Sequence, residues 1–162
     1  MITENKNIYS QEELKQLQYL FTKQLPWYFS EHQVLDKDTN YYFFHHFFSN
    51  GRIESPFFEV LDPVLKILKP YAIINIRANL VTNRFKPIYS AFHTDKFNNE
   101  KLHHKTSIFY VNTSNGFTEF KNGDKIMCEE NKMISFDANQ EHRGCSQTDT
   151  AHRIVINLNY FN

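Results

Sequence analysis

Residues 153–160 read Arg-Ile-Val-Ile-Asn-Leu-Asn-Tyr, and residues 74–80 read Ile-Asn-Ile-Arg-Ala-Asn-Leu. Apolar side chains recur at every second position in both stretches, as in a strand with one apolar and one polar face. Residues 107–111 are more continuously apolar, which is typical of a strand covered on both sides, and residues 133–136 predict a shorter strand. The second half of the chain is therefore expected to form a sheet.

The first part of the chain carries helix signals instead. Ser10 and Glu13 form a capping box, in which each side chain can bond the other residue's backbone N–H. Leucine and phenylalanine then recur at helical spacing over residues 14–25, and Pro26 ends the run.

A second helix is predicted over residues 57–68, with Pro56 before it as a start signal. Pro63 lies inside this run and removes a backbone donor, so we expect a kink there, or a restart capped by Asp62. The aromatic stretch at residues 41–48 has no clean period, and it predicts an irregular strand or a buried loop.

Helices followed by many short strands favour an α+β, mainly β domain whose sheets form a sandwich or jelly roll. A chain of 162 residues fits a single domain. We expect one domain over residues 1–162, with a helical part at about 1–70 packed on one sheet of a jelly-roll core at about 71–162.

Charge and composition narrow the functional classes. Lysine plus arginine and aspartate plus glutamate both number 18, so no general attraction to nucleic acid or to anionic lipid is expected. Two cysteines without CxxC spacing predict reduced thiols. No stretch is apolar and long enough for a signal peptide or a membrane span, so we expect a cytoplasmic protein. Nothing in the sequence predicts the oligomeric state.

The candidate chemistry begins at His93-Thr94-Asp95. In a strand, His93 and Asp95 point to the same face, so both side chains can reach one point. Two histidines and one carboxylate on one face of an octahedron leave three open positions, the arrangement of non-haem iron oxygenases. The pair alone is weak evidence, because eight histidines in a chain of this length give such spacing by chance quite often.

Two later residues strengthen the pattern. His142 lies just past the short strand predicted at residues 133–136, and Arg153 opens the last strand. Arg153 shares its face with Val155 and Asn157, away from the apolar side chains. A guanidinium on the inner face of a barrel needs a partner, and its fork geometry matches a carboxylate, such as that of an anionic co-substrate.

From residue 89 to residue 161 the sequence resembles the 2-oxoglutarate/iron(II) dioxygenase superfamily, particularly its small prolyl-hydroxylase-like members. Residues 89–95 resemble the first metal motif of that group, and residues 110–112 with 116–120 are similar to its hairpin. Residues 136–142 and then Arg153 resemble the second metal motif and the anchor of the 2-oxoglutarate distal carboxylate.

The chain departs from the family pattern at two positions. Phe117 replaces a usual glycine, and Val155 stands where some members carry a serine that supports the arginine. These departures put in doubt the details of co-substrate support and leave the metal triad unaffected.

The resemblance implies a double-stranded β-helix with iron(II) held by His93, Asp95 and His142. It also implies an enzyme that uses O2 and couples decarboxylation of 2-oxoglutarate, to succinate and CO2, with hydroxylation of a peptidyl residue such as proline or of a small molecule. Arg153 would pair with 2-oxoglutarate, and Tyr110 and Asn79 are further candidate contacts to it.

Two other functional interpretations of the sequence stay open at this point. A cupin-like metal enzyme without 2-oxoglutarate would share the jelly roll, but the usual cupin spacing is absent and Arg153 would be unexplained. A non-enzymatic jelly-roll binding domain would need only a hydrogen-bonded His93–Asp95 pair. Neighbouring residues of a strand face opposite sides, so His45-His46 and His103-His104 are not expected to chelate a metal. Asn75 and Arg77 could line the pocket or face water.

Overall fold

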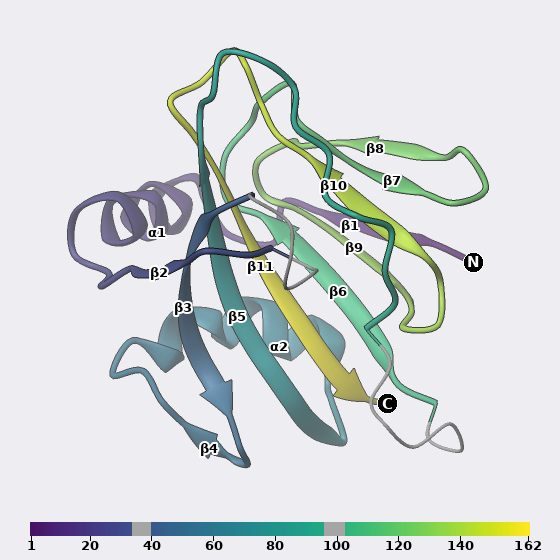
Figure 1. Cartoon of the computed structure of the whole chain (residues 1–162). Helices are drawn as coiled ribbons and strands as arrows, with labels where there is room; N and C mark the ends of the chain where they lie inside the picture. The colour runs from purple at the N-terminus through teal and green to yellow at the C-terminus, as the bar shows by residue number, and fades with distance from the viewer. Residues whose placement is uncertain (34–39, 96–102) are drawn as a thin grey trace.

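The computed structural model describes residues 1–33, 40–95 and 103–162. Two antiparallel sheets dominate the molecule, and two helices cover one face of the larger sheet (Figure 1). The helical elements are α1 (Gln11–Lys23), the 3-10 turn η1 (Phe58–Leu61) and α2 (Asp62–Leu68). The strands are β1 (Thr3–Lys6), β2 (Tyr28–Ser30), β3 (Tyr42–Ser49), β4 (Arg52–Ile53), β5 (Ala72–Thr82), β6 (Lys105–Tyr110), β7 (Phe117–Phe120), β8 (Lys125–Met127), β9 (Lys132–Asp137), β10 (His142–Cys145) and β11 (His152–Phe161).

The large sheet is built around the antiparallel pair β5 and β11. Its strand order is β1-β9-β6-β11-β5-β3-β2, with β4 beside β3, and the small sheet has the order β10-β7-β8. Val81 lies opposite Arg153, and the register holds until a bulge between Asn159 and Tyr160. Because of this bulge, Ile73 rather than Ile74 packs against the core. The jelly roll expected from the alternation is confirmed.

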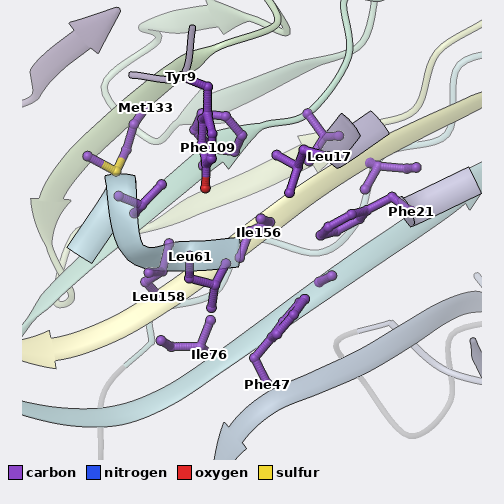
Figure 2. Close-up of a cluster of buried hydrophobic side chains, with 14 of the residues drawn as sticks. Tyr9, Leu17, Phe21, Phe47, Leu61, Ile76, Phe109, Met133, Ile156 and Leu158 are labelled. Atoms are coloured by element: carbon purple, nitrogen blue, oxygen red, sulfur yellow. The ribbon is translucent and has the colours of Figure 1, made fainter. Parts of the chain in front are cut away.

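One core lies between the large sheet and the helices. Phe21 of α1 stacks on Phe47 of β3, and Leu61 and Ile76 are buried beside them (Figure 2). Leucines and phenylalanines along α1 therefore meet one face of the sheet, as their helical spacing predicted.

A second, smaller core fills the other face of the same sheet. Along β6, Phe109 belongs to the helix-side core, whereas Ile108 and Tyr110 belong to the second cluster together with Phe120 of the small sheet. Successive side chains of a strand alternate in this way, so β6 is covered on both faces, as predicted.

The helix ends agree with the sequence, with one exception. Ser10 caps α1 and forms the complete capping box with Glu13. The predicted break at Pro63 appears as the change from η1 to α2, but the prediction that Asp62 caps the restart is wrong. Asp62 is already the first helical residue, and Leu61 occupies the cap position without a side-chain bond. Neither helix in the described ranges has the length and apolar character needed to cross a bilayer.

The aromatic stretch at residues 41–48, expected to be an irregular strand or a buried loop, forms most of the strand β3 inside the large sheet, between β5 and β2, and the pairing of β3 with β5 shifts register between His46 and Phe48. His45 and Phe47 are buried on the helix side, whereas Phe44 and His46 lie opposite Asn79 and Arg77 on the other face. Aromatic residues on both faces hid the period of two. The part of the chain before residue 70 thus contributes strands as well as helices.

The capping box gives a stability prediction. Ser10→Ala leaves the backbone N–H of Glu13 without its 3.3 Å acceptor and is expected to lower the free energy of unfolding by about 1 kcal/mol. Urea unfolding measures this, and Ser10→Asp, which keeps an acceptor, should stay close to the wild type. An equal loss in both variants would contradict the capping role.

Candidate metal centre

Two short extended segments bring the predicted ligands together. His93 and His142 form an isolated antiparallel bridge, in which each backbone N–H donates to the other's carbonyl at 3.0 Å. The N–H of Asp95 donates to the carbonyl of Ala138, also at 3.0 Å. These backbone hydrogen bonds therefore fix the Cα positions of His93, Asp95 and His142.

The three side chains converge. Nε2 of His93 lies 3.8 Å from Oδ1 of Asp95, and Nε2 of His142 lies 3.8 Å from Oδ2 of the same carboxylate. One donor atom from each residue lies within 4.8 Å of the others, and no other such cluster of His, Cys, Asp and Glu occurs in the described parts of the chain. Two imidazole nitrogens and one carboxylate form a facial set that suits a divalent transition metal.

The tautomers of both rings suit this purpose. Nδ1 of His93 lies 3.1 Å from the carbonyl of Ala91, and Nδ1 of His142 lies 3.0 Å from the carbonyl of Gln140. A carbonyl oxygen only accepts, so Nδ1 of each ring must carry the proton. In the neutral ring Nε2 then keeps its lone pair, and it faces Asp95. Such bonds to the second nitrogen are what orient metal-bound histidines.

The carboxylate is held as well. The hydroxyl oxygen of Thr106 lies 2.9 Å from Oδ2 of Asp95 and 2.8 Å from Oδ1 of Asn159, and the two acceptors share its single proton. Nε2 of His104 bonds the backbone carbonyl of Asp95 at 2.9 Å. Thr106 and Asn159 lie opposite each other on β6 and β11, so the main sheet positions the carboxylate. Sequence reasoning missed both residues, because neither belongs to a motif.

Burial sets the electrostatics of His142. Its ring lies 4.8 Å from that of Phe136 and 6.1 Å from that of Phe120, measured between centroids. This desolvation lowers the pKa of His142, against the opposing attraction of Asp95. The ring is thereby kept neutral, the state in which it can bind a metal.

A cavity opens from this centre onto the sheet. Both histidines line it, together with polar side chains of β5 and β11. The full lining, within the described ranges, is Gln33, Tyr42, Arg77, Asn79, Val81, Ser90, His93, Ile108, Thr118, His142, Gly144, Arg153, Val155 and Asn157. Two arginines and no aspartate or glutamate are in this set, so the cavity favours an anion.

Arg153 is the more buried of these arginines, with 6% of its surface exposed. Its side chain makes no hydrogen bond or ion pair with any described residue, and its Nε is buried without a partner. Its guanidinium carbon lies 5.9 Å from the centroid of the Tyr110 ring. A buried guanidinium without an anion is costly, so the site is incomplete without a ligand of opposite charge.

Gly116 makes room for this side chain. A Cβ at that position would lie 2.8 Å from Cδ of Arg153 and 2.9 Å from the carbonyl oxygen of Cys145. Both distances are too short for a real Cβ, so an added methyl group would displace the Arg153 side chain and would also force a backbone shift relative to Cys145. The sequence contained the glycine in its hairpin motif but not the reason for it.

We expect Gly116→Ala to weaken about tenfold the binding of 2-oxoglutarate, the anion that the sequence resemblance assigns to Arg153, because a small displacement of the guanidinium group is enough to lose its geometry. Isothermal titration calorimetry measures this affinity. Gly144→Ala is the matched control, since its Cβ would meet Arg153 Nη1 at an ordinary 3.8 Å and should have a smaller effect. Equal effects of the two substitutions would contradict the fit described for Gly116.

The remaining predicted contacts differ in their placement. Asn79 lines the cavity, and its Oδ1 is buried without a partner. Tyr110 is fully buried beneath Arg153 and is not among the lining residues; its hydroxyl donates to Thr118, which does line the cavity. Burial raises the pKa of the Tyr110 hydroxyl. Direct bonds from Asn79 and Tyr110 to a co-substrate stay predictions.

His45 and the rim residue Arg143 have local partners, whereas Nδ1 of His46 is buried without one. Nδ1 of His45 bonds the carbonyl of Pro26, and its Nε2 bonds the hydroxyl of Ser55, both at 2.8 Å. Arg143 donates to Glu119 at 2.6 Å, beside the second metal motif. Cys128 and Cys145 are free and buried.

Comparison with known proteins finds likeness in structure alone. No protein-family model matches the sequence, and no curated protein matches it either. The chain is similar over 99% of its length to a 2OG-Fe(II) oxygenase family oxidoreductase from Burkholderia pseudomallei, with a TM-score of 0.72, 10% identity and 84% of that chain covered.

Two further structures carry bound molecules. One is a prolyl hydroxylase from Trichoplax adhaerens in complex with a peptide fragment of the hypoxia inducible factor oxygen degradation domain (TM-score 0.68, 13% identity, 99% of this chain and 83% of that chain). The other is the epimerase SnoN in complex with Fe3+, alpha ketoglutarate and nogalamycin RO (TM-score 0.68, 9% identity, 99% and 78%). The fold inferred from the sequence resemblance is confirmed as the fold of these oxygenases.

Proposed function

We propose that this chain is an iron(II) and 2-oxoglutarate-dependent oxygenase that hydroxylates a peptidyl residue or a small molecule. Iron(II) would be held by His93, Asp95 and His142, and the distal carboxylate of 2-oxoglutarate by Arg153. The observation that carries the proposal is the joint presence, at one cavity, of a facial His-Asp-His set and a buried arginine without an anion.

The residues present fit these two groups. In the neutral ring of each histidine, Nε2 keeps its lone pair and faces the carboxylate of Asp95, which would offer an anionic oxygen to a dication. Arg153 lies in the same cavity and offers its guanidinium fork to a carboxylate. A chelating 2-oxoacid whose far end is also anionic satisfies both requirements at once.

Iron(II) and 2-oxoglutarate together would activate O2, with loss of CO2 and formation of succinate, and supply the oxidising power for hydroxylation. The protein would do the rest. His93, Asp95 and His142 would hold the metal, Arg153 would orient the co-substrate, and the apolar side chains around His142 would exclude water.

The substrate class is left broad by the neighbours. The hydroxylase from Trichoplax adhaerens holds a peptide, and SnoN holds nogalamycin RO. Proteins of this fold therefore accept both kinds of molecule, and fold alone does not choose between them.

The test is to add iron(II) and 2-oxoglutarate to metal-free, anaerobic protein and record the visible spectrum. Chelation of iron(II) by 2-oxoglutarate gives a charge-transfer band without any prime substrate. We expect the band to form and to saturate at one iron per chain. Iron binding without a band would favour a cupin-like metal enzyme, and no iron binding would leave a jelly-roll binding domain; either result overturns the proposal.

A further inference from the structure

A second arginine in the cavity has no role in the proposed function. Arg77 lies on β5, lines the cavity with His93 and His142, and is half-buried. No described residue forms a hydrogen bond or ion pair with its side chain. Its guanidinium carbon lies 5.6 Å from the centroid of the Tyr42 ring, near the outer limit of a cation–π contact, so its charge lacks a strong partner.

The sheet register separates Arg77 from Arg153. Arg153 lies opposite Val81, and Arg77 lies opposite Asn157 on the same pair of strands. Four residues along a strand correspond to roughly 13 Å. This is the separation of the backbones, which the two long side chains can partly bridge. The 2-oxo end of a co-substrate held at Arg153 would chelate the metal, so that co-substrate does not require Arg77.

The cross-strand pair of Arg77 and Asn157 is next to the residue that helps to position Asp95. Asn159, which shares the Thr106 hydroxyl with Asp95, lies two residues beyond Asn157 on the same face of β11. Along the sheet, Arg77 therefore lies between the position of Asn159 and that of Arg153, but on the neighbouring strand β5, to one side of the line that joins those two residues along β11.

The surroundings of Arg77 are apolar and aromatic on one side and polar on the other. Phe44 lies 6.2 Å from Tyr42 and 6.0 Å from Tyr28, measured between ring centroids, so aromatic rings continue from the cavity to the edge of the sheet. On the other side, Oδ1 of Asn79 and Oδ1 of Asn157 are buried without a partner.

We propose that the prime substrate is an organic acid whose anionic group pairs with Arg77 and whose apolar body lies against Tyr42 and Phe44. The inference rests on the proposed function and adds to it the chemical class of the substrate. The charge of Arg77 supplies the recognition, because no acid lines the described cavity to compete with the ligand. The free Oδ1 atoms of Asn79 and Asn157 then accept N–H or O–H groups of the same molecule.

The experiment measures binding of matched acids and amides to protein loaded with Zn(II) and saturating 2-oxoglutarate, in which no turnover occurs. The probes are acetate, phenylacetate and 3-phenylpropionate, each beside its neutral amide. The wild type is expected to bind the phenyl acids at least about tenfold more tightly than their amides, since a charge-assisted pair is stronger than a neutral one. Arg77→Gln should remove this preference, and Arg77→Lys should retain part of it.

Two controls make the result specific. Arg52→Gln removes an exposed arginine that pairs with Glu54 and should leave every affinity unchanged. Arg77→Gln should also leave the affinity for 2-oxoglutarate within about twofold of the wild type, measured by the charge-transfer band with iron(II).

The outcomes separate the two proposals. Equal binding of acids and amides by the wild type, or a preference that survives Arg77→Gln, would overturn the substrate assignment while the band still forms. A loss of 2-oxoglutarate affinity in Arg77→Gln would make Arg77 a co-substrate residue and overturn it as well. Absence of the band in the wild type is a failure of the oxygenase proposal instead, recorded before any acid is added.

Discussion

His142→Ala is expected to lower the affinity for iron(II) by more than about a hundredfold and to remove the charge-transfer band with 2-oxoglutarate. Replacing a residue that hydrogen-bonds a metal ligand lowers metal affinity about 10- to 100-fold, and His142→Ala removes a ligand itself. His142 is also the most buried of the three ligands, so no exposed group can replace it. Anaerobic titration with iron(II), followed at the band and by metal analysis, measures the loss.

The control is His152→Ala. His152 is half-buried, lies near the start of β11 and borders a different surface hollow beside α1, so iron binding should be unchanged. If His142→Ala still bound one iron per chain with the band intact, the metal centre would have to be placed elsewhere. Circular dichroism of both variants separates loss of the metal from loss of the fold.

Arg153→Met is expected to weaken 2-oxoglutarate binding by more than about a hundredfold while iron(II) still binds. The substitution removes the bidentate, charge-assisted pair between the guanidinium group and the co-substrate carboxylate, in a buried site where water replaces it poorly. The melting temperature of the ligand-free protein should not fall. Arg153 is buried without an anionic partner there, and methionine fills the same space at no desolvation cost.

The combination of these two results is diagnostic. A structural arginine would lose stability on replacement, whereas a ligand-binding arginine loses affinity alone. Arg143→Met is the matched control, because Arg143 lies on the rim and already pairs with Glu119, so its loss should leave 2-oxoglutarate affinity within about twofold. Unchanged affinity in Arg153→Met, together with a lower melting temperature, would contradict the assigned role.

Local sequence patterns predicted a helix or strand well where one face of that element is apolar and the other is polar. Ser10, Glu13 and the spacing of leucines were sufficient for α1, and the alternation before and after Asn157 was sufficient for β11. For β3 the same logic left an irregular strand and a buried loop both open, because aromatic side chains cover both of its faces. It failed at Asp62, because the tight turn η1 runs directly into α2 and leaves no extended cap position.

The sequence by itself determined the helix α1, a jelly roll, and the inward side of the last strand, since these follow from periods of 3.6 and 2 within single segments; the helix-then-strand order that it suggested is wrong, because β1 to β4 lie before residue 70. It also singled out His93, Asp95, His142 and Arg153 through an ordered motif, although the motif contains no distances. Their roles toward iron and 2-oxoglutarate stay predictions for the experiments above.

Only the tertiary structure decided which of these side chains meet. The bridge between His93 and His142 and the bond from Thr106 to Asp95 join segments that are far apart in the chain. Arg77 and Arg153 share one cavity because β5 and β11 pair in one particular register. A shift of that register by one residue would turn every side chain of a strand to its other face, and no local pattern specifies the pairing of distant segments.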